Sequence, residues 1–599
     1  MSRFLLAPMS RLLTALLLAV VSARALADAS LPNETQEQYD RRAQWFRDAK
    51  VGVFIHWNPS VIIEKEISWC RDGVGREFYD GLYKRFDPKR FDADEWIRIF
   101  HDAGIRYAVF VPKHHDGFAM FRTKTYDYNV LNTPFGRDYT KEVAEACRKG
   151  GVKFCLYYSI LDWWNPHYSQ KPGADLTDYV EKAFKPHMQE LLTQYGPVGA
   201  IWFDGNWESS WTRAHALNVA TLIRRLQPDL LIGNRLEPKA RVPNPELRGS
   251  DEPGVRINGD LPFVSSFYDA PDAIGDYQAR EMMWGHYYDK KAWDSCYNFA
   301  PTPSAPNGAW SWLAGAKPRP LDQIVNWIVK CVVRDGNALL GIGPKPDGTI
   351  DEASAVRLKE LGVWLRANGE AIYGTRGGPW LPGEWGGSTR RGNKAYLLVQ
   401  SWPGESLRLP ALPVAVTGAK LLGGSPVGVS KVGGMLEFRV PQGLRTPMVT
   451  ILEVSLAADV MRVAPVAVPE PKVVSLACPV TVSSFWYGRP ELSFAHLTDG
   501  NPSTTWAASE AQRSASVTVD LGQSRRIAEV RVSDAPYGRV RRFDVEVETP
   551  SGWRKVAEGA AIGPDRRVAI PDVAGTKVRI NLREATDTPT LAEVTVLGY

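Results

Sequence analysis

The sequence predicts an α/β barrel of the (β/α)8 type, followed by a β-sandwich and a second all-β module. From Val51 to about Gly343, short unbroken apolar runs alternate with longer amphipathic segments, as in a barrel of buried parallel strands. After Tyr373 the pattern changes to short alternating runs separated by Gly and Pro. An open, doubly wound sheet is the alternative for the first part, but no glycine-rich phosphate loop follows the first apolar run.

The N-terminus has the three parts of a secretory signal peptide. Arg3 and Arg11 are its positive residues, the apolar stretch 12–21 (LLTALLLAVV) follows, and Ala25-Leu26-Ala27 supplies a small-x-small cleavage site. The apolar stretch is too short to span a bilayer, which needs about 20 residues. We therefore expect an exported protein, periplasmic or secreted, that begins near Asp28; a membrane-anchored form is the competing interpretation.

Repeated strand–helix units make up the expected barrel. The predicted strands are VGVFIHW (51–57), YAVFVPK (107–113), KFCLYYS (153–159), AIWFDG (200–205), LLIGNR (230–235) and ALLGIG (338–343). Between them we expect helices at 93–104, 139–151, 219–227 and 321–333, several of which end at Gly or Pro.

The remaining chain predicts two smaller all-β parts. Short strands at 377–455 indicate an antiparallel sandwich, VAPVAVPEPKVV (463–474) is typical of a stiff linker, and more short strands follow. The expected organisation is a signal peptide at 1–27, a catalytic barrel at 28–375, a β-sandwich at 376–460, a linker at 461–474 and a second module at 475–599.

Composition excludes some function classes. Lys and Arg number 72 against 67 Asp and Glu, so the formal charge is only +5, and three of the arginines lie in the first 27 residues. A chain so near neutrality has no general electrostatic reason to bind nucleic acid. The 21 Trp, 22 Tyr and 21 Phe provide flat apolar faces that suit sugar rings. The six cysteines include no CxxC pair and no Cys/His cluster, so there is no zinc signature.

The predicted strand ends are polar and aromatic. In a barrel of this type, catalytic groups lie at the carboxyl ends of the strands. These ends read His56-Trp57, Lys113-His114-His115-Asp116-Gly117, Tyr157-Tyr158, Trp202-Phe203-Asp204-Gly205 and Asn234-Arg235. Packing alone would not put five such ends on one rim, so we expect an active site there.

Asp204 is the strongest single candidate, because it ends an apolar strand and precedes a glycine that lets a substrate approach. The pair His114-His115 suggests a metal, but adjacent strand residues point to opposite faces and could not easily chelate one ion. We therefore expect both histidines to donate hydrogen bonds to hydroxyl groups.

Six segments together resemble the α-L-fucosidase family of retaining glycoside hydrolases. They are FIHW, KHHDGF, LYYS, IWFDG, GDYQARE and GNALLGIGPKPDGTI with its helix, in order from about residue 40 to 375. The resemblance implies a barrel, two catalytic carboxyl groups and no catalytic cofactor. It also implies an exo-acting enzyme that removes terminal fucose from oligosaccharides or glycoconjugates with net retention.

The resemblance assigns roles to individual residues. Asp204 matches the nucleophile and Glu281, in GDYQARE, the general acid/base. Where many members have Glu-Trp, this chain has Ser68-Trp69, so a hydroxyl contact is changed or is supplied by Glu66. The other positions that match sugar-binding residues are His56, Trp69, His114, His115, Tyr157, Trp202 and Arg235, with Trp310 against the fucose methyl group.

The identity of the acid is less firmly indicated than that of the nucleophile. Glu281 follows Asp204 across a stretch rich in other acids, so Glu208, Asp251, Glu252, Asp276 and Asp294 also remain candidates. We expect Asp204 to be ionised and the pKa of Glu281 to be raised while Asp204 is free.

The last module resembles the discoidin-like (coagulation factor 5/8 C-type) carbohydrate-binding modules. The resemblance lies in LTDGNPSTTW (497–506), SVTVDLG and the closing LAEVTVLGY. It implies a structural calcium ion near Asp499, Asn501 and Thr504. It also implies sugar contacts from loops at one end, for which Trp486, Tyr487, Tyr537 and Arg539 are candidates.

Two other functions remain open from the sequence. One is a retaining α-glycosidase that acts on another sugar, such as galactose. The other is a non-catalytic carbohydrate-binding protein, although the presence of both Asp204 and Glu281 disfavours it.

Overall fold

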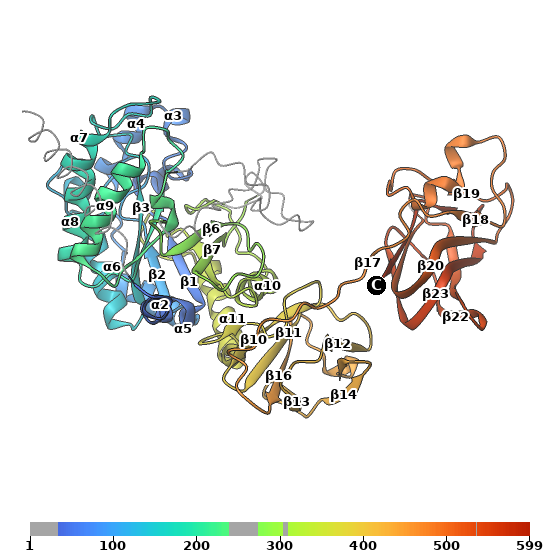
Figure 1. The fold of residues 1–599 in the computed structure, drawn as a ribbon. Helices are drawn as coiled ribbons and strands as arrows, with labels where there is room; N and C mark the ends of the chain where they lie inside the picture. The colour runs from blue at the N-terminus through green and yellow to red at the C-terminus, as the bar shows by residue number, and fades with distance from the viewer. Residues whose placement is uncertain (1–33, 239–272, 303–308, 535) are drawn as a thin grey trace, which may run out of the picture.

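The computed structural model describes residues 34–238, 273–302, 309–534 and 536–599, and it contains three successive structural parts (Figure 1). The expected signal peptide at 1–27 lies outside the described residues. None of the helices within those ranges is both long and apolar enough to cross a membrane.

Eight parallel strands form the first part, in the order β5-β4-β3-β2-β1-β8-β7-β6. A parallel bridge between Gly233, just after β5, and Tyr277, at the start of β6, joins the two edges. The predicted α/β barrel is therefore confirmed. Its strands are β1 (Val51–Ile55), β2 (Tyr107–Phe110), β3 (Lys153–Ser159), β4 (Ala200–Asp204), β5 (Leu231–Ile232), β6 (Tyr277–Glu281), β7 (Ala292–Asn298) and β8 (Asn337–Ile342).

Amphipathic helices cover the outside of the barrel. Asp92 caps α5 by accepting a hydrogen bond from the Glu95 amide, and Asp138 caps α6 in the same way. The four predicted helices form, whereas α8 was not predicted because its apolar period is weak and Pro186 lies in its first turn. The bounds are α5 (Ala93–Asp102), α6 (Tyr139–Lys149), α8 (Lys185–Gln194), α9 (Arg213–Leu226), α10 (Leu321–Val332) and α11 (Glu352–Asn368).

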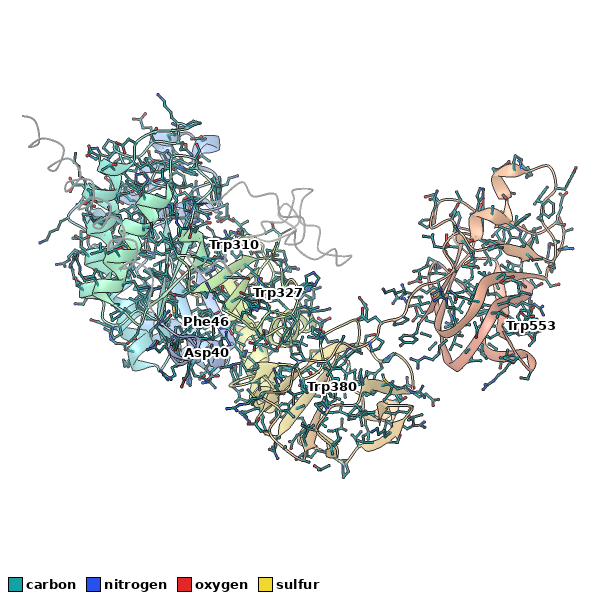
Figure 2. The ribbon with its side chains drawn as sticks, viewed as in Figure 1. Asp40, Phe46, Trp310, Trp327, Trp380 and Trp553 are labelled. Atoms are coloured by element: carbon teal, nitrogen blue, oxygen red, sulfur yellow. The ribbon has the colours of Figure 1, made fainter. Side chains whose placement is uncertain are left out.

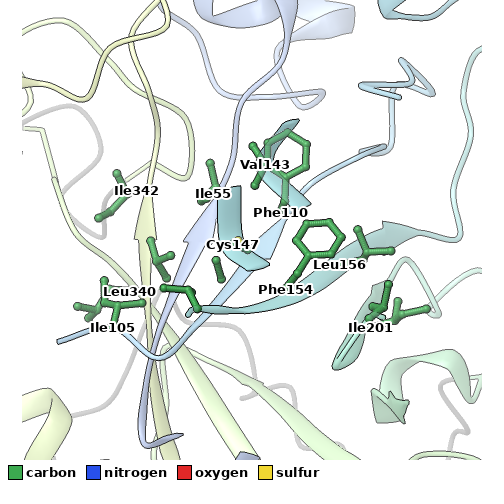
Figure 3. Packing of buried hydrophobic residues seen from close by; sticks show 14 of the residues in the cluster. Ile55, Ile105, Phe110, Val143, Cys147, Phe154, Leu156, Ile201, Leu340 and Ile342 are labelled. Carbon is green, nitrogen blue, oxygen red and sulfur yellow. The ribbon is translucent and has the colours of Figure 1, made fainter. Parts of the chain in front are cut away.

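Alternate residues of each strand face the helices and the barrel interior. In β1, Val51, Val53 and Ile55 pack in the outer layer, of which Figure 3 shows Ile55 with its neighbours. Phe54 belongs instead to the inner cluster. Gly52 also faces inward, and a Cβ there would lie 2.4 Å from the Tyr107 ring. A glycine at this position therefore leaves room for the tyrosine that fills the interior.

Helix α2 (Gln36–Ala49) covers the amino-terminal end of the barrel. Its Tyr39 and Phe46 belong to the inner cluster, and the Tyr39 hydroxyl donates to the carbonyl of Asp276 at 2.8 Å. The amide of Ala292 donates to the same hydroxyl. With one end closed by these contacts, access to the interior is at the carboxyl ends of the strands.

Two antiparallel sheets follow the barrel and enclose a core of their own. Trp380 lies in this core, away from the barrel residue Trp310 (Figure 2). One sheet contains β9 (Arg376–Gly377), β10 (Gly386–Arg391), β11 (Lys394–Val399), β13 (Val416–Leu421) and β16 (Thr450–Leu456). The other contains β12 (Ser406–Pro410), β14 (Gly428–Val432) and β15 (Met435–Arg439).

The last part is a separate all-β module with a third core. Two long strands, β20 (Ala515–Ser533) and β23 (Arg566–Ala585), pair along most of their length and form its centre. Around them lie β17 (Lys472–Val473), β18 (Val480–Val482), β19 (Trp506–Ala507), β21 (Val540–Thr549), β22 (Gly552–Gly559), β24 (Thr590–Leu591) and β25 (Glu593–Gly598).

The segment expected as a linker, 461–474, is held at both ends. Val466 forms a bridge with Trp380, and the Glu470 carboxylate accepts a hydrogen bond from the Glu384 amide, so the first half packs on the sandwich. Strand β17 pairs with β25 of the last module. Little of this segment is thus free of contacts.

Candidate active site

Polar side chains from six strands meet at the open end of the barrel. Asp204 is the last residue of β4, Glu281 the last of β6, and Tyr157 lies near the end of β3. His56 follows β1, His114 and His115 follow β2, and Arg235 lies on the short 3-10 turn Asn234–Leu236 after β5. The site therefore has the location that a barrel of this type favours.

Arg235 joins the two carboxyl groups. Its Nη1 donates to Asp204 Oδ1 at 3.0 Å, and its Nη2 donates to Glu281 Oε2 at 3.1 Å. The guanidinium carbon lies 4.3 Å from the centre of the Trp202 ring, and Nε donates to the carbonyl of Ala279 at 3.2 Å. These contacts fix the guanidinium plane and hold two carboxylates from different strands within reach of one cation.

Asp204 lies deep in the pocket, where its side chain is 13% exposed. Burial raises the pKa of this carboxyl, while Arg235 and the Tyr157 hydroxyl, which donates to Oδ2 at 3.1 Å, oppose the rise. Gly205 follows with a φ of 91°, and a Cβ there would lie 2.6 Å from the Leu161 side chain. The glycine is therefore required by the turn that presents Asp204.

Glu281 lies nearer the mouth of the pocket, with its side chain 37% exposed. Burial raises its pKa, Arg235 lowers it, and the charge of Asp204 raises it again. The direction matches the one expected of a carboxyl that remains protonated beside an ionised neighbour.

The two adjacent histidines face one pocket, contrary to the expectation that they point to opposite faces. Strand β2 ends at Phe110, so His114 and His115 lie on a turn, and their ring centres are 4.1 Å apart. The Ser68 hydroxyl lies 2.7 Å from His114 Nδ1, and the Ser159 hydroxyl lies 2.7 Å from His115 Nδ1. Because each Nδ1 has a protein partner, only the Nε2 atoms are left for a ligand.

Aromatic rings form the walls of the pocket. Tyr157 stacks on Trp202 with ring centres 5.8 Å apart and on His114 at 5.2 Å. The half-buried Trp310 lies 5.3 Å from the buried His56 ring. A sugar ring in this pocket would therefore meet flat apolar surfaces as well as hydrogen-bonding groups.

Trp69 lies at the rim and is 56% exposed. Its ring lies edge-on to His115 with centres 5.1 Å apart, and it also contacts Trp163 and Trp207. The last two were not among the predicted site residues, and neither has a sequence pattern that separates it from the many other tryptophans.

Glu66 contacts the Trp310 loop rather than the two catalytic candidates. Oε2 accepts from the Trp310 amide at 2.8 Å, and Oε1 accepts from the amides of Ser311 at 3.2 Å and Ile67 at 3.1 Å. Burial raises the pKa of Glu66 to about 7, whereas these donors lower it. Its carboxylate is thus occupied by backbone amides, which indicates that it holds this loop in place.

The alternative acids lie elsewhere. Asp276 directly precedes β6, at the amino-terminal end of that strand, and forms ion pairs with Arg42 and Arg224. Asp294 is fully buried and accepts from the Tyr107 hydroxyl at 3.3 Å, and burial raises its pKa to about 8. Neither shares Arg235 with Asp204, and among the residues that the structure describes no hydrogen bond joins the Glu208 carboxylate to the site. Asp251 and Glu252 lie outside the described residues.

The last module has the predicted turn. Asp499 Oδ1 accepts from the Asn501 amide at 2.8 Å, and Oδ2 accepts from the Thr504 hydroxyl at 2.9 Å. Glu593, at the start of β25, was not predicted here; burial and the charge of Asp499 raise its pKa to about 7. Its Oε2 is buried without a hydrogen-bond partner.

The exposed aromatic residues of this module include two of the four candidates for sugar contacts. Tyr487 is 89% exposed and packs near Phe485, and Tyr537 stacks on Arg539 with 4.6 Å between the guanidinium carbon and the ring centre. Arg489 lies over the ring of Trp486.

Comparison with known proteins gives two family matches. The α-L-fucosidase family matches residues 18–252 and 258–370, more than half of the chain. A NedA-like galactose-binding domain family matches residues 496–580, within the last module.

Individual relatives agree with the first of these matches. Human tissue α-L-fucosidase is 26% identical over 409 residues, covering 63% of this chain and 79% of the human protein. The solved structure of α-L-fucosidase isoenzyme 1 from Paenibacillus thiaminolyticus is 29% identical, with a TM-score of 0.59, and covers 70% of this chain and 99% of that one. An α-L-fucosidase from Bacteroides thetaiotaomicron, trapped as a covalent intermediate with 2-fluoro-fucosyl fluoride, is similar in fold, with 23% identity, a TM-score of 0.59, and coverage of 70% and 97%.

Proposed function

The chain belongs to the α-L-fucosidase family of glycoside hydrolases, and from this premise we propose that Asp204 is its nucleophile and Glu281 its general acid/base. The observation that carries the proposal is the shared guanidinium of Arg235, which bonds one carboxylate from β4 and one from β6. Retaining glycosidases need two carboxyl groups about 5–5.5 Å apart, and two groups that share one guanidinium are close enough for this.

The reaction proceeds in two displacements. Asp204 attacks the anomeric carbon while Glu281 gives its proton to the glycosidic oxygen, so the bond to the leaving alcohol breaks and an ester to Asp204 forms. Glu281 then takes a proton from water, whose oxygen attacks the same carbon and releases Asp204. Two inversions leave the configuration of the sugar retained.

The electrostatics support this exchange of roles. While Asp204 is ionised, its charge contributes to the raised pKa of Glu281, which keeps the acid protonated. Once Asp204 is esterified, that charge is gone and the pKa of Glu281 falls. Glu281 is then ionised and can act as the base towards water.

Trp310 supports fucose over galactose as the sugar. Its half-buried ring, with Phe54 and His56 beside it, gives the pocket an apolar wall. Such a wall favours the C6 methyl group of fucose over the hydroxymethyl group of galactose, whose hydroxyl would lose its hydrogen bonds to water. The natural substrates are then terminal α-L-fucosyl groups of oligosaccharides or glycoconjugates.

Replacing the nucleophile tests the proposal. Asp204→Gly is expected to lower kcat on 4-nitrophenyl α-L-fucoside on the order of 10⁴-fold or more, the scale seen when a covalent nucleophile is removed. Azide should restore part of this activity, because it fits the space of the lost carboxylate, and should form the fucosyl azide. Glu281→Ala is expected to spare activated aryl fucosides and to abolish hydrolysis of fucosyl disaccharides, whose leaving groups need a proton.

The contrary results are equally definite. Ordinary activity in Asp204→Gly would refute the assignment of the nucleophile, and a wild-type product with inverted configuration in proton NMR would refute the two-step mechanism. Hydrolysis of 4-nitrophenyl α-L-galactoside, which differs from the fucoside only by its C6 hydroxyl, in preference to the fucoside would refute the choice of sugar.

For the last module we propose a structural calcium ion and a sugar-binding role. Asp499, Asn501, Thr504 and Glu593 would hold the ion, because the unpartnered Glu593 oxygen beside the Asp499 carboxylate is a site of uncompensated negative charge. The ion would tie the 499–504 turn to strand β25. The exposed Tyr487 and Tyr537 support sugar contacts, and the family match supports galactose-type ligands.

We also propose that the protein is exported, on the evidence of the basic, apolar and small-residue parts of residues 1–27. The mature chain is then expected to begin near Asp28. Mass spectrometry of protein purified from the producing organism measures this directly, and an intact N-terminal Met1 peptide would contradict it.

A further inference from the structure

The rim residue Trp69 follows a turn whose backbone conformation is uncommon. Ser68 has a φ of 60°, in the left-handed region that residues other than glycine seldom adopt, and the Trp69 amide donates to the Ile67 carbonyl at 2.6 Å. Such a conformation persists only where the surrounding structure holds it. The contacts of the chain on either side of Trp69 therefore determine where its ring lies.

Helix α4 (Arg76–Asp80) supplies these contacts through its last two residues. The Tyr79 hydroxyl accepts a hydrogen bond from the Ser68 amide at 2.8 Å. The Asp80 carboxylate accepts from Arg71 Nε at 2.7 Å and from its Nη2 at 2.5 Å. Because the two acceptors are adjacent on one helix, the chain is held on both sides of the tryptophan.

Tyr79 is itself anchored to the loop after β2. Its hydroxyl donates to Asp116 Oδ2 at 2.6 Å, and this buried carboxylate also accepts from Asn58 Nδ2 at 2.6 Å and from the Phe118 amide at 3.0 Å. Burial and the charge of Asp116 raise the pKa of Tyr79 well above its ordinary value, so the phenol keeps the proton that it donates. One hydroxyl group thus links this loop to the backbone beside Trp69.

The exposed Trp69 ring is within reach of a sugar in the pocket, whereas Tyr79 is not. The edge of the Trp69 ring contacts His115, whose Nε2 lies 3.6 Å from Asp204 Oδ2. Tyr79 is 2% exposed, so it can act on a sugar only through the residues that it holds. An aromatic ring that is fixed before the sugar binds loses less conformational freedom on binding.

We propose that Tyr79 is a positioning residue, which fixes Trp69 at the rim of the sugar pocket through the Ser68 backbone. Asp80 acts in the same way through Arg71. The inference rests on the proposed function, because the sugar that Trp69 meets is the one bonded to Asp204 during the reaction. Both residues act on binding rather than on the bond that breaks, so their loss should raise KM more than it lowers kcat.

Tyr79→Phe removes one oxygen atom and keeps the ring. The Ser68 amide loses its acceptor, whereas Asp116 keeps its bonds from Asn58 and Phe118, so the loop after β2 stays in place. KM for 4-nitrophenyl α-L-fucoside and the dissociation constant of L-fucose, measured by calorimetry, are both expected to rise roughly 3- to 10-fold, with kcat within about twofold of the wild type.

Tyr83→Phe is the matched control. Tyr83 lies four residues further along the chain, and its ring contacts Phe118 and Tyr128. This variant should leave KM, kcat and the dissociation constant of L-fucose unchanged. A fall in kcat with an unchanged KM in Tyr79→Phe would overturn the inference, because Tyr79 would then act on the reaction rather than on binding.

A combination with Trp69→Ala assigns the effect to the tryptophan. Trp69→Ala alone is expected to raise the same two constants roughly 3- to 10-fold, the value of one aromatic contact. In that background Tyr79→Phe should change them by less than about twofold, since the ring that it positions is gone. A full effect of Tyr79→Phe in the Trp69→Ala protein would overturn the inference, because the hydroxyl would then act through another group.

Asp80→Asn is a second variant, which decides the question even where Tyr79→Phe fails to fold. It weakens the pairing with Arg71 and should raise KM only where Trp69 is present. Asp72→Asn is its matched control, since Asp72 pairs with Arg76 in the same part of the chain but both side chains are exposed, and it should leave KM unchanged. An unchanged KM in folded Asp80→Asn would refute the role of Asp80.

Wild-type activity separates failure of this inference from failure of the proposed function. A wild-type protein that hydrolyses 4-nitrophenyl α-L-fucoside, with no coupling between positions 79 and 69, refutes the positioning alone. A wild-type protein that neither hydrolyses the fucoside nor binds L-fucose refutes the proposed function.

Discussion

Arg235 is the residue on which the charge states of both carboxyl groups depend. Its guanidinium bonds Asp204 and Glu281 at 3.0 and 3.1 Å and lowers the pKa of each against the rise that burial causes. A positive charge between two acids stabilises their ionised forms. The proposed mechanism needs only one of the two carboxyl groups ionised in the resting enzyme, so the interaction of each with Arg235 is expected to set the pH range of activity.

Removal of the cation is therefore expected to move the pH profile. In Arg235→Met, the pKa of each carboxyl rises, since the ionised forms lose their partner. The proposed mechanism requires Asp204 to be ionised and Glu281 protonated, so the acidic and basic limbs of kcat/KM on 4-nitrophenyl α-L-fucoside are both expected to move to higher pH. The maximum should fall by roughly 10²-fold or more, as when a preorganised charge is lost from an active site.

Arg235→Lys is the control for the charge. It keeps a cation but cannot bond two carboxylates with a planar fork, so its limbs should stay near their wild-type positions while the maximum falls. A shift of the Arg235→Met limbs to lower pH would contradict the roles assigned to the two acids.

The sequence identified the site residues that end strands, but not the residues that hold those side chains in position. Asp204, Tyr157 and Arg235 each lie at the end of a strongly apolar run, and this pattern predicted their place at the ends of strands. Ser68 and Ser159 were not identified as partners of the histidines, because their importance comes from contacts across 46 and 44 residues of sequence. No local pattern encodes such a pairing.

The loop that carries Trp310 is the element with the most unusual support. The amides of Trp310 and Ser311 donate to Glu66, which lies in the segment after β1, 244 residues before Trp310 in the sequence. A carboxylate that accepts from successive backbone amides satisfies donors that would otherwise need other partners, and so holds that part of the chain in place. Glu66 therefore acts on the sugar pocket through the position of Trp310.

Glu66→Gln is expected to weaken sugar binding more than chemistry. The side-chain NH2 group of the glutamine would face a backbone N–H that it cannot bond. At least one hydrogen bond to the loop is therefore lost, and the position of the Trp310 ring becomes less well fixed. KM for 4-nitrophenyl α-L-fucoside should rise roughly 3- to 10-fold, the value of one hydrogen bond, with kcat nearly unchanged. Glu64→Gln, an exposed position two residues away, is the matched control and should leave both constants unchanged. If kcat fell and KM did not, Glu66 would touch the reaction rather than the loop.

Two strands of the barrel were harder to predict than the others. Strands β6 (YQARE) and β7 (AWDSCYN) carry charged residues and were not among the predicted strands, although they complete the barrel. Glu281 and Asp294 face the interior, where function rather than packing sets the composition, whereas Arg280 lies on the outer side over the ring of Trp293. The strands that lack such residues, such as β1 and β8, were predicted nearly to their bounds.

The whole molecule is organised around separate apolar cores. The last module buries a cluster of its own, and so does the interior of the sandwich, but the outer cluster of the barrel also includes Tyr396, Leu398 and Ile451 of the sandwich. The 461–474 segment is bonded to the sandwich at one end and to the last module at the other. Domains with independent cores unfold as separate units when few contacts cross between them. A ligand that binds one of them should therefore stabilise that unit alone.

Calcium is expected to stabilise the last module and nothing else. The Asp499 turn and the half-buried Glu593 carboxyl belong to that module, and a cation between them would relieve the repulsion that contributes to the raised pKa of Glu593. In scanning calorimetry, calcium at about a hundred times its dissociation constant should raise one unfolding transition by roughly 5–10 °C. Glu593→Gln should remove this shift, while a chain that ends at Glu470 should lack the transition and hydrolyse 4-nitrophenyl α-L-fucoside within about twofold of the full chain. If calcium shifts no unfolding transition of the full chain, the proposed ion is excluded. If the shortened chain loses hydrolysis, the last module is required for the activity of the barrel.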